Sequence, residues 1–198
     1  HPPFIIAEVG INHNGELEKA YKMIEVAKAS GANAVKFQSY KAEKIAAKKS
    51  PSYWDTNEEK TLSQYELFKK YDKFEKTDFF KLKKYCGKKK IDFLSTPFDE
   101  EIVDELNPLV SLFKIASADI TNLPLLKKIA NKKKPIILST GASNLNEIHF
   151  AYNFLKKNGC KEIILLHCIL GYPTKYENAN LKMIESLKKE FPNSFIGY

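Results

Sequence analysis

The sequence contains no arginine, so all 32 basic side chains among its 198 residues are lysines. It holds only three cysteines, Cys86, Cys160 and Cys168, and their odd number without C-x-x-C spacing excludes a disulfide framework and a zinc knuckle. No apolar run reaches the roughly 18 residues that a membrane span needs. No basic segment followed by an apolar one opens the chain as an export signal. We therefore expect a cytoplasmic protein with no membrane partner.

The formal net charge of +8 raises the question of a nucleic-acid partner. The lysines fall mostly in runs at expected helix ends and turns, where cations are favourable. These runs lie at 48–49, 88–90, 132–134 and 188–189. Because such runs are typical of solvated surfaces, we expect no nucleic-acid partner.

Short apolar runs alternate with longer segments of helical period, which is typical of repeated βα units around a parallel sheet. The expected strands are 4–7, 34–37, 91–94, 112–115, 136–138, 163–166 and 195–197. The expected helices are 17–30, 77–89, 100–106, 123–131, 145–158 and 181–190. Most units advance by roughly 20 to 30 residues, the size of one module of a (β/α)8 barrel. The predicted fold class is therefore α/β, a (β/α)8 TIM barrel that is truncated within strand seven.

One unit of this pattern is longer than the others. Residues 39–76 carry the only tryptophan and many tyrosine, lysine and glutamate residues. We interpret them as a long βα loop with one short helix of its own. Loops on that side of a barrel commonly build binding sites.

Polar residues lie at or just after the carboxyl ends of the expected strands, where parallel barrels carry their reacting groups. These residues are Glu8, Lys36, Gln38, Ser95, Thr96, Lys114, Ser117, Asp119, Ser139, Thr140 and His167. A buried ammonium group is disfavoured without an anion, and both Lys36 and Lys114 emerge from apolar strands. Hydroxyls and turn amides suit phosphate oxygens. The pattern predicts a phosphorylated carboxylate as ligand, and the alternative is an ion pair inside the barrel.

Six segments of the chain carry a family resemblance. They are residues 6–15 (IAEVGINHNG), 35–38 (VKFQ), 94–98 (LSTPF), 113–117 (FKIAS), 135–141 (PIILSTG) and 165–168 (LLHC) with Tyr172 and Pro173. In this order they resemble the sialic acid synthases, which include the N-acetylneuraminate, legionaminate and pseudaminate synthases. The resemblance runs over nearly the whole chain and is specific for the family, but it does not identify the member.

This resemblance implies a transferase whose partners are phosphoenolpyruvate and an N-acyl amino sugar. Such a synthase condenses phosphoenolpyruvate with an N-acetylmannosamine-type sugar to a sialic-acid-like nonulosonic acid, and phosphate leaves after attack by water and C–O cleavage. By resemblance, the residues that bind phosphoenolpyruvate are Lys36, Thr96, Lys114, Ser117 and Ser139. Gln38 and Tyr172 match positions that face the sugar and the reacting centre. The expected catalytic residues are Glu8, Asp119 and Tyr172.

Two positions depart from the family's pattern. Asp119 stands where several members carry glutamate, so the carboxylate reaches one methylene less far. Leu170 stands where the family often places an asparagine or serine that bonds the ligand.

The family's metal, Mn²⁺ or Mg²⁺, is held by histidines that follow strands seven and eight, past Tyr198. We therefore assign no metal ligand in this chain and interpret His13 and His167 as hydrogen-bonded scaffolding. Residues 1–198 are expected to form an incomplete catalytic domain, without the family's C-terminal antifreeze-like domain. The fragment alone is expected to be inactive, and the intact protein is expected to be a homodimer.

Two alternatives stay open. One is another phosphoenolpyruvate-dependent or aldolase-type barrel, such as the related heptulosonate and octulosonate phosphate synthases. Those enzymes should bind a sugar phosphate through arginines, and the absence of arginine weighs against this alternative. The other is a non-catalytic sugar-binding remnant of such a barrel.

Overall fold

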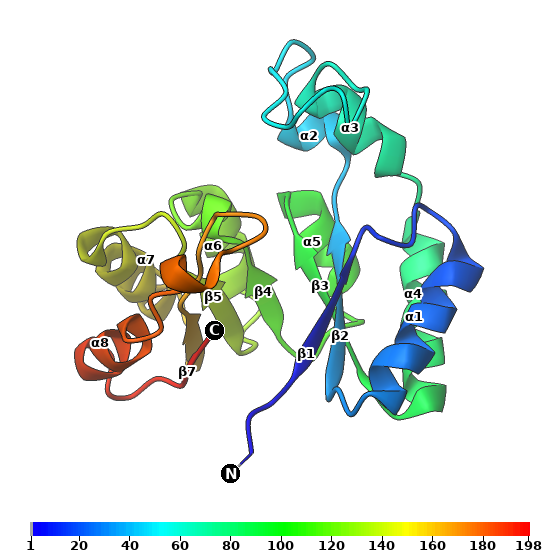
Figure 1. Ribbon diagram of the computed structural model, residues 1–198. Helices are drawn as coiled ribbons and strands as arrows, with labels where there is room; N and C mark the ends of the chain where they lie inside the picture. The colour runs from blue at the N-terminus through cyan, green and yellow to red at the C-terminus, as the bar shows by residue number, and fades with distance from the viewer. Residues whose placement is uncertain (1) are drawn as a thin grey trace. The chain divides into compact units, whose positions relative to one another are not determined.

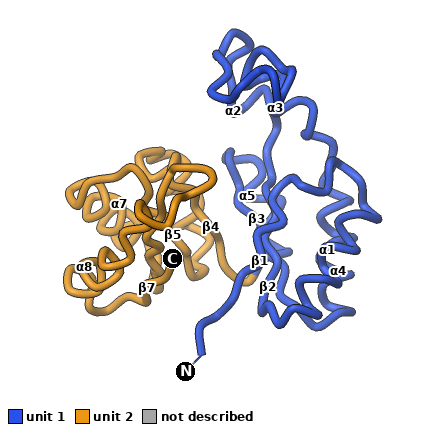
Figure 2. Tube along the Cα trace, in the orientation of Figure 1, with its two compact units in different colours: residues 1–110 blue, residues 111–198 orange. Residues whose placement is uncertain are grey.

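The computed structural model describes residues 2–198. The chain divides into two compact units, the first ending at Val110 and the second beginning at Ser111 (Figure 2). Each unit contains one parallel sheet with its own helices. No helix between residues 2 and 198 combines the length and the apolar character that crossing a membrane requires.

The sheet of the first unit has the strand order β1-β2-β3. Its strands are β1 (Ile6–Gly10), β2 (Ala34–Ser39) and β3 (Asp92–Pro97), and neighbouring strands run parallel. The register places Glu8 opposite Lys36 and Gln38 opposite Thr96. Between Glu8 and Gly10 the pairing is irregular, and Gly10 has the positive φ of +56° that favours glycine.

Helices α1 (Leu17–Ala29) and α4 (Lys76–Lys89) lie together on one face of this sheet, as Figure 1 shows. The three-four spacing of α1 buries Ala20, Ile24 and Ala27, and the helix ends before Gly31, whose φ is +86°. Helix α5 (Glu100–Leu106) is capped by Asp99, whose Oδ1 accepts from the Ile102 amide at 2.9 Å. The fully buried side chains of this unit include Ile24, Phe37, Leu82, Phe93, Leu94 and Leu106.

A long segment, residues 40–75, extends beyond the carboxyl end of β2 (Figure 1). It contains α2 (Ala42–Ile45) and α3 (Gln64–Tyr71). The sequence predicts one short helix here, and the structure corrects this to two. Ser63 starts α3 by accepting a hydrogen bond from the Glu66 amide at 3.1 Å, a capping signal that a polar, aperiodic segment hides.

The sheet of the second unit has the strand order β4-β5-β6-β7. Its strands are β4 (Phe113–Ile115), β5 (Ile136–Ser139), β6 (Ile163–Leu166) and β7 (Ile196–Gly197), all paired in parallel. Between them lie α6 (Leu123–Ala130), α7 (Leu145–Lys157), α8 (Met183–Glu190) and the 3-10 turns η1 (Ser117–Asp119) and η2 (Tyr176–Asn178). Its core includes Phe113, Ile115, Leu126, Ile129, Ile136 and Leu138.

The observed strands of the first unit run further than the apolar runs predict. Because β2 and β3 keep pairing as far as Ser39 and Pro97, Gln38 and Thr96 lie inside strands rather than after them, whereas Lys36 lies inside β2 as predicted. Glu8 likewise lies inside β1. The predicted strands ended before Glu8, Gln38 and Ser95, and these boundaries were wrong because backbone pairing does not depend on side-chain polarity. As a consequence, the alternation of side chains along a strand decides from which face of the sheet each of these side chains projects.

Candidate functional site

The first group of predicted site residues, here the Lys36 cluster, consists of Glu8, Lys36 and Thr96. The Lys36 ammonium lies 2.8 Å from Glu8 Oε2 and donates to Thr96 Oγ1 at 3.0 Å. Lys36 is opposite Glu8, and Thr96 is two residues beyond its partner Leu94, so all three side chains project from one face of the sheet. The Lys36 side chain is 6% exposed and that of Glu8 is 60% exposed. The ion-pair alternative is therefore realised, but with a carboxylate that solvent reaches.

Ser95 does not join this cluster. It neighbours Thr96 on β3, so its side chain projects from the opposite face. There its hydroxyl is 2.7 Å from that of Ser39, and both residues are buried. Because side chains alternate along a strand, Ser95 does not share a face with Lys36 and Thr96.

The second group, here the Lys114 cluster, consists of Lys114, Ser117, Asp119, Ser139 and Gly141. The Lys114 ammonium donates to Ser139 Oγ at 2.5 Å and to the Ile115 carbonyl at 2.9 Å. Ser139 lies two residues beyond Ile137, the β5 partner of Lys114, so the two side chains share a face. Both residues are buried. The structure thus brings a strand lysine and a hydroxyl group together within this unit.

Ser117 is fixed by the turn after β5. Its hydroxyl accepts a hydrogen bond from the Gly141 amide at 2.9 Å. A Cβ added at Gly141 would lie 2.9 Å from Ser117 Oγ and 3.0 Å from Leu170 Cδ2. An alanine at this position would require the Ser117 hydroxyl to move, so Gly141 helps to position it. The sequence motif PIILSTG contains Gly141, but the sequence gives no sign that Ser117 is its neighbour.

Asp119 ends the short turn η1 and is largely buried. Its Oδ1 accepts from Asn122 Nδ2 at 3.2 Å, while its Oδ2 is buried without a hydrogen-bond partner among residues 2–198. Burial raises the pKa of Asp119 above its ordinary value, against the lowering effects of the Asn122 hydrogen bond and the Lys114 charge. Asn122, not Asp119, caps α6, because Asn122 Oδ1 accepts from the Leu125 amide at 3.3 Å.

Tyr172 and Gln38 are less constrained by their surroundings than the lysines are. Tyr172 lies in the turn between β6 and η2 with 89% of its surface exposed. The structure thus does not pack it against the Lys114 cluster. Gln38, at the end of β2, lines a small cavity together with His13, Tyr40 and Asp72.

The two histidines considered as metal ligands are engaged in scaffolding contacts. His13 Nδ1 accepts from the Gly15 amide at 3.0 Å, and His167 Nε2 lies 2.9 Å from the Ala179 carbonyl. Within the described part of the chain, no group of three or more histidine, cysteine, aspartate or glutamate side chains is arranged to hold a metal ion. The residues present therefore do not fit the divalent metal that the resemblance implies.

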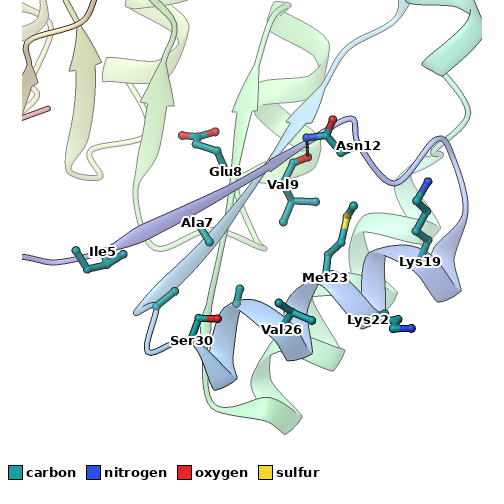
Figure 3. Close-up of a pocket in the computed structure, with 12 residues that line it drawn as sticks. Ile5, Ala7, Glu8, Val9, Asn12, Lys19, Lys22, Met23, Val26 and Ser30 are labelled. Atoms are coloured by element: carbon teal, nitrogen blue, oxygen red, sulfur yellow. Dashed lines mark hydrogen bonds between the residues drawn. The ribbon is translucent and has the colours of Figure 1, made fainter. Parts of the chain in front are cut away.

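A pocket of about 610 Å³ lies between β1 and α1 (Figure 3). It is lined mainly by apolar side chains such as Val9, Met23 and Val26. Figure 3 shows the Glu8 carboxylate pointing away from Met23 and Val26. Glu8 of the Lys36 cluster is among its lining residues, whereas Lys36 and Thr96 are not.

Comparisons with known proteins relate these clusters to one family. A model of the NeuB family matches residues 23–198. The uncharacterized protein MJ1065 of Methanocaldococcus jannaschii is 48% identical over the whole chain, which covers 55% of that protein. The N,N'-diacetyllegionaminic acid synthase of Campylobacter jejuni is 50% identical over 94% of this chain and 57% of its own length. The chain thus spans about half the length of these curated relatives.

A solved structure extends the similarity to the fold. The N-acetylneuraminic acid (sialic acid) synthetase of Leptospira borgpetersenii, in complex with citrate, matches with a TM-score of 0.85 and 38% identity. The match covers all of this chain and 65% of that one. The predicted α/β fold with the strand and helix order of a (β/α)8 barrel is confirmed, and so is the suspected family. The chain belongs to the NeuB family.

Proposed function

We propose that this chain carries phosphoenolpyruvate-binding and proton-handling residues of a nonulosonic acid synthase. Such an enzyme joins phosphoenolpyruvate to an N-acetylmannosamine-type sugar and releases phosphate. The observation that supports this most is that each unit buries a strand lysine whose ammonium group donates to a hydroxyl group on the neighbouring strand. Synthases of sialic and legionaminic acids are among its relatives.

The chemistry of each cluster supports the binding of anionic oxygens. Lys36 and Thr96 in one unit, and Lys114 and Ser139 in the other, supply positive charge and hydrogen-bond donors with little exposure to water. Charge-assisted hydrogen bonds to phosphate or carboxylate are strong where water is excluded. The similar Leptospira synthetase holds citrate, a polycarboxylate, and this supports anion binding by the fold.

In the proposed reaction, C3 of phosphoenolpyruvate forms a bond with the aldehyde carbon of the sugar. Water adds at C2, and cleavage of the C2–O bond releases inorganic phosphate. The lysines stabilise the phosphate and carboxylate charges, while the hydroxyls of Thr96, Ser117 and Ser139 orient their oxygens. Gln38 and Tyr172 are proposed to face the sugar.

A proton must be accepted and returned when the new C–C bond forms and water adds. Asp119 is the carboxylate best suited to this task, because burial raises its pKa toward the working pH and one of its oxygens makes no hydrogen bond within the described residues. Glu8 is the second candidate, but its carboxylate is bound to Lys36. We assign proton transfer to Asp119 first and to Glu8 second.

Further parts of the proposal concern the full-length protein. Its divalent metal, Mn²⁺ or Mg²⁺, would be bound by residues outside this chain, since no set within residues 2–198 fits one. We propose that the protein is a cytoplasmic homodimer.

The decisive experiment incubates the full-length protein with phosphoenolpyruvate, Mn²⁺ and a panel of N-acyl mannosamine-type sugars. We expect one sugar to give a nonulosonic acid, identified by mass, with one phosphate released per product. The isolated 198-residue chain is the control and should give none. Phosphate release without a C–C-bonded product, or no consumption of phosphoenolpyruvate with any sugar, would contradict the proposal.

A further inference from the structure

We propose that Asp72 and His13 are positioning residues for the sugar side of the reaction. They fasten the 40–75 segment to the carboxyl ends of β1 and β2, next to Gln38. This inference rests on the proposed function, in which Gln38 faces the sugar. Neither residue is part of the Lys36 cluster or the Lys114 cluster.

The two ends of the 40–75 segment, residues 40–42 and 72–75, are here called its neck. Asp72 joins these two ends. Its Oδ2 accepts from the Ala42 amide at 3.0 Å, and its Oδ1 lies 3.4 Å from the Lys41 ammonium. The Asp72 side chain is 1% exposed, although carboxylates are rarely buried unless they are paired. Since Ala42 begins α2 and Asp72 follows α3, one buried carboxylate joins the two ends of the segment.

Lysines around the neck balance the charge of Asp72. Lys69 Nζ lies 3.9 Å from its Oδ2, and Lys41 also donates to Glu75 Oε1 at 3.0 Å. The ring of Tyr40 packs edge-on against Phe68, and its hydroxyl donates to the Phe68 carbonyl at 3.3 Å. The two ends of the segment are thus joined by side-chain contacts.

His13 fastens the same neck from the other side. Its ring is 2% exposed and stacks on Phe74 with centroids 4.0 Å apart and planes at 3°. Two residues on, Gly15 has a φ of +77°, and an added Cβ would collide with the Lys73 side chain. The loop between β1 and α1 is therefore packed closely against residues 73–74.

A cavity of about 10 Å³ lies where these segments meet, and Gln38, Tyr40, His13 and Asp72 line it. This volume is about what one water molecule needs. His13 Nε2 is buried without a hydrogen-bond partner among residues 2–198, and Asp72 Oδ1 has none apart from its ion pair with Lys41. A water there would satisfy both atoms and connect them to Gln38.

The protonation of His13 agrees with this arrangement. Burial lowers the pKa of His13 to about 4, so the ring is neutral near pH 7. Because Nδ1 accepts from the Gly15 amide, Nε2 carries the proton and is a donor beside Gln38. The His13 ring and the Asp72 carboxylate, which line the cavity with Gln38, are therefore both held in place by their own contacts.

The test compares Asp72→Ala and Asp72→Asn with the parent in the full-length protein. We expect Asp72→Ala to raise the KM for the amino sugar by about 10-fold and to leave the KM for phosphoenolpyruvate within about twofold, as for a displaced orienting group. Asn keeps an acceptor for the Ala42 amide and loses the charge, so about threefold is expected. His13→Phe, which keeps the stacked ring, should act in the same direction.

A second measurement needs no activity. In the 198-residue chain, hydrogen exchange of peptides around Ala42 should be about 10-fold faster in Asp72→Ala, because a buried acceptor is lost. Glu101→Gln is the matched control: it removes an exposed ion pair at 2.8 Å from Lys44 of α2 and should change neither exchange nor KM.

The outcomes separate this inference from the proposed function. Equal changes in both KM values, or unchanged exchange in Asp72→Ala, would overturn the positioning role while leaving the synthase intact. If the parent itself makes no nonulosonic acid, the proposed function fails and the role toward the sugar fails with it, whereas the exchange result still decides whether Asp72 fastens the segment.

Discussion

In the Lys36 cluster the ammonium group lies 2.8 Å from a carboxylate that is 60% exposed, whereas in the Lys114 cluster it donates to the hydroxyl of Ser139 and a backbone carbonyl. Both lysines project from a strand and are buried. The two lysines differ in how closely a carboxylate approaches the ammonium group. Glu8 is in direct contact with its lysine, while Asp119 is affected by Lys114 through its charge and keeps a raised pKa.

This difference assigns different tasks to the two carboxylates. A carboxylate in direct contact with an ammonium group balances a buried charge until a ligand arrives. A buried carboxylate with a raised pKa exchanges protons near neutral pH more readily. The comparison therefore predicts that Glu8 is important for charge balance and Asp119 for the chemical step.

The largest expected effect is that of Asp119→Asn on turnover. The substitution keeps the shape and the contact with Asn122 but removes basicity, so kcat should fall about 100-fold or more with a modest change in KM. In the parent, the acidic limb of the kcat profile should lie above the ordinary carboxyl pKa, and it should vanish in the variant. Steady-state kinetics against pH measure both quantities.

Stability provides the control for Asp119→Asn. Because the folded state raises the pKa of Asp119, this group stabilises the fold when protonated, and that stability is lost as pH rises through the raised pKa. Removing the charge should thus leave the variant at least as stable as the parent at pH 7. A kcat within threefold of the parent would transfer the proton role to Glu8 and break the comparison.

The next effect is that of Lys114→Ala on phosphoenolpyruvate binding. Losing a charge-assisted bond to a buried phosphate costs about 1.5 to 3 kcal/mol, so the KM for phosphoenolpyruvate should rise roughly 10- to 150-fold. The KM for the sugar should change far less. Equal effects on both substrates would remove Lys114 from the phosphate site.

The matched variant for the other cluster removes its ion pair without a change in net charge. Lys36→Met combined with Glu8→Gln should raise the KM for phosphoenolpyruvate less than Lys114→Ala does, because the lost lysine charge was already balanced. An increase as large as that of Lys114→Ala would show that Lys36 leaves Glu8 for the ligand.

A smaller effect is expected from Gly141→Ala. The new Cβ would lie 2.9 Å from Ser117 Oγ, so the hydroxyl must move and the KM for phosphoenolpyruvate should rise about 3- to 10-fold. Gly87→Ala is the control, since a Cβ in α4 there meets nothing within 4 Å and should stabilise the chain by about 0.5 to 1 kcal/mol. Equal KM values for both variants would remove Gly141 from the positioning of Ser117.

The sequence predicts the fold well where apolar periodicity is strong. The order of strands and helices is confirmed because each apolar run is buried in a sheet, and α5 begins and ends where predicted because Asp99 caps it. The 40–75 segment is the exception. Its helices are short and their start signals are local hydrogen bonds, such as that of Ser63, which periodicity does not detect.

The side-chain contacts of the candidate site cannot be predicted from the sequence alone. Once the register is known, the alternation of side chains places Lys36 on one face with Glu8 and Thr96 and places Ser95 on the other face. The register itself is a property of the pairing between strands and cannot be read from the sequence of one strand. The sequence analysis does not single out Asp72, because an aspartate between two expected helices is typical of an ordinary helix-capping residue. Its burial depends on Ala42, thirty residues earlier in the chain.

The smallest expected effect concerns the stability contribution of the Glu8–Lys36 pair. One partner is 60% exposed, and in Glu8→Gln the Lys36 ammonium keeps the Thr96 hydroxyl and gains an amide oxygen as acceptor. The free energy of unfolding of the 198-residue chain should therefore fall by about 1 kcal/mol or less, as for pairs that solvent screens. Urea unfolding of parent and variant measures this, with Glu101→Gln as the fully surface-exposed counterpart. A loss above about 3 kcal/mol is typical of an uncompensated buried charge. Such a loss would show that burial of Lys36 depends on Glu8. Glu8 would then be a permanent structural counter-ion of Lys36, not a carboxylate that the ligand displaces.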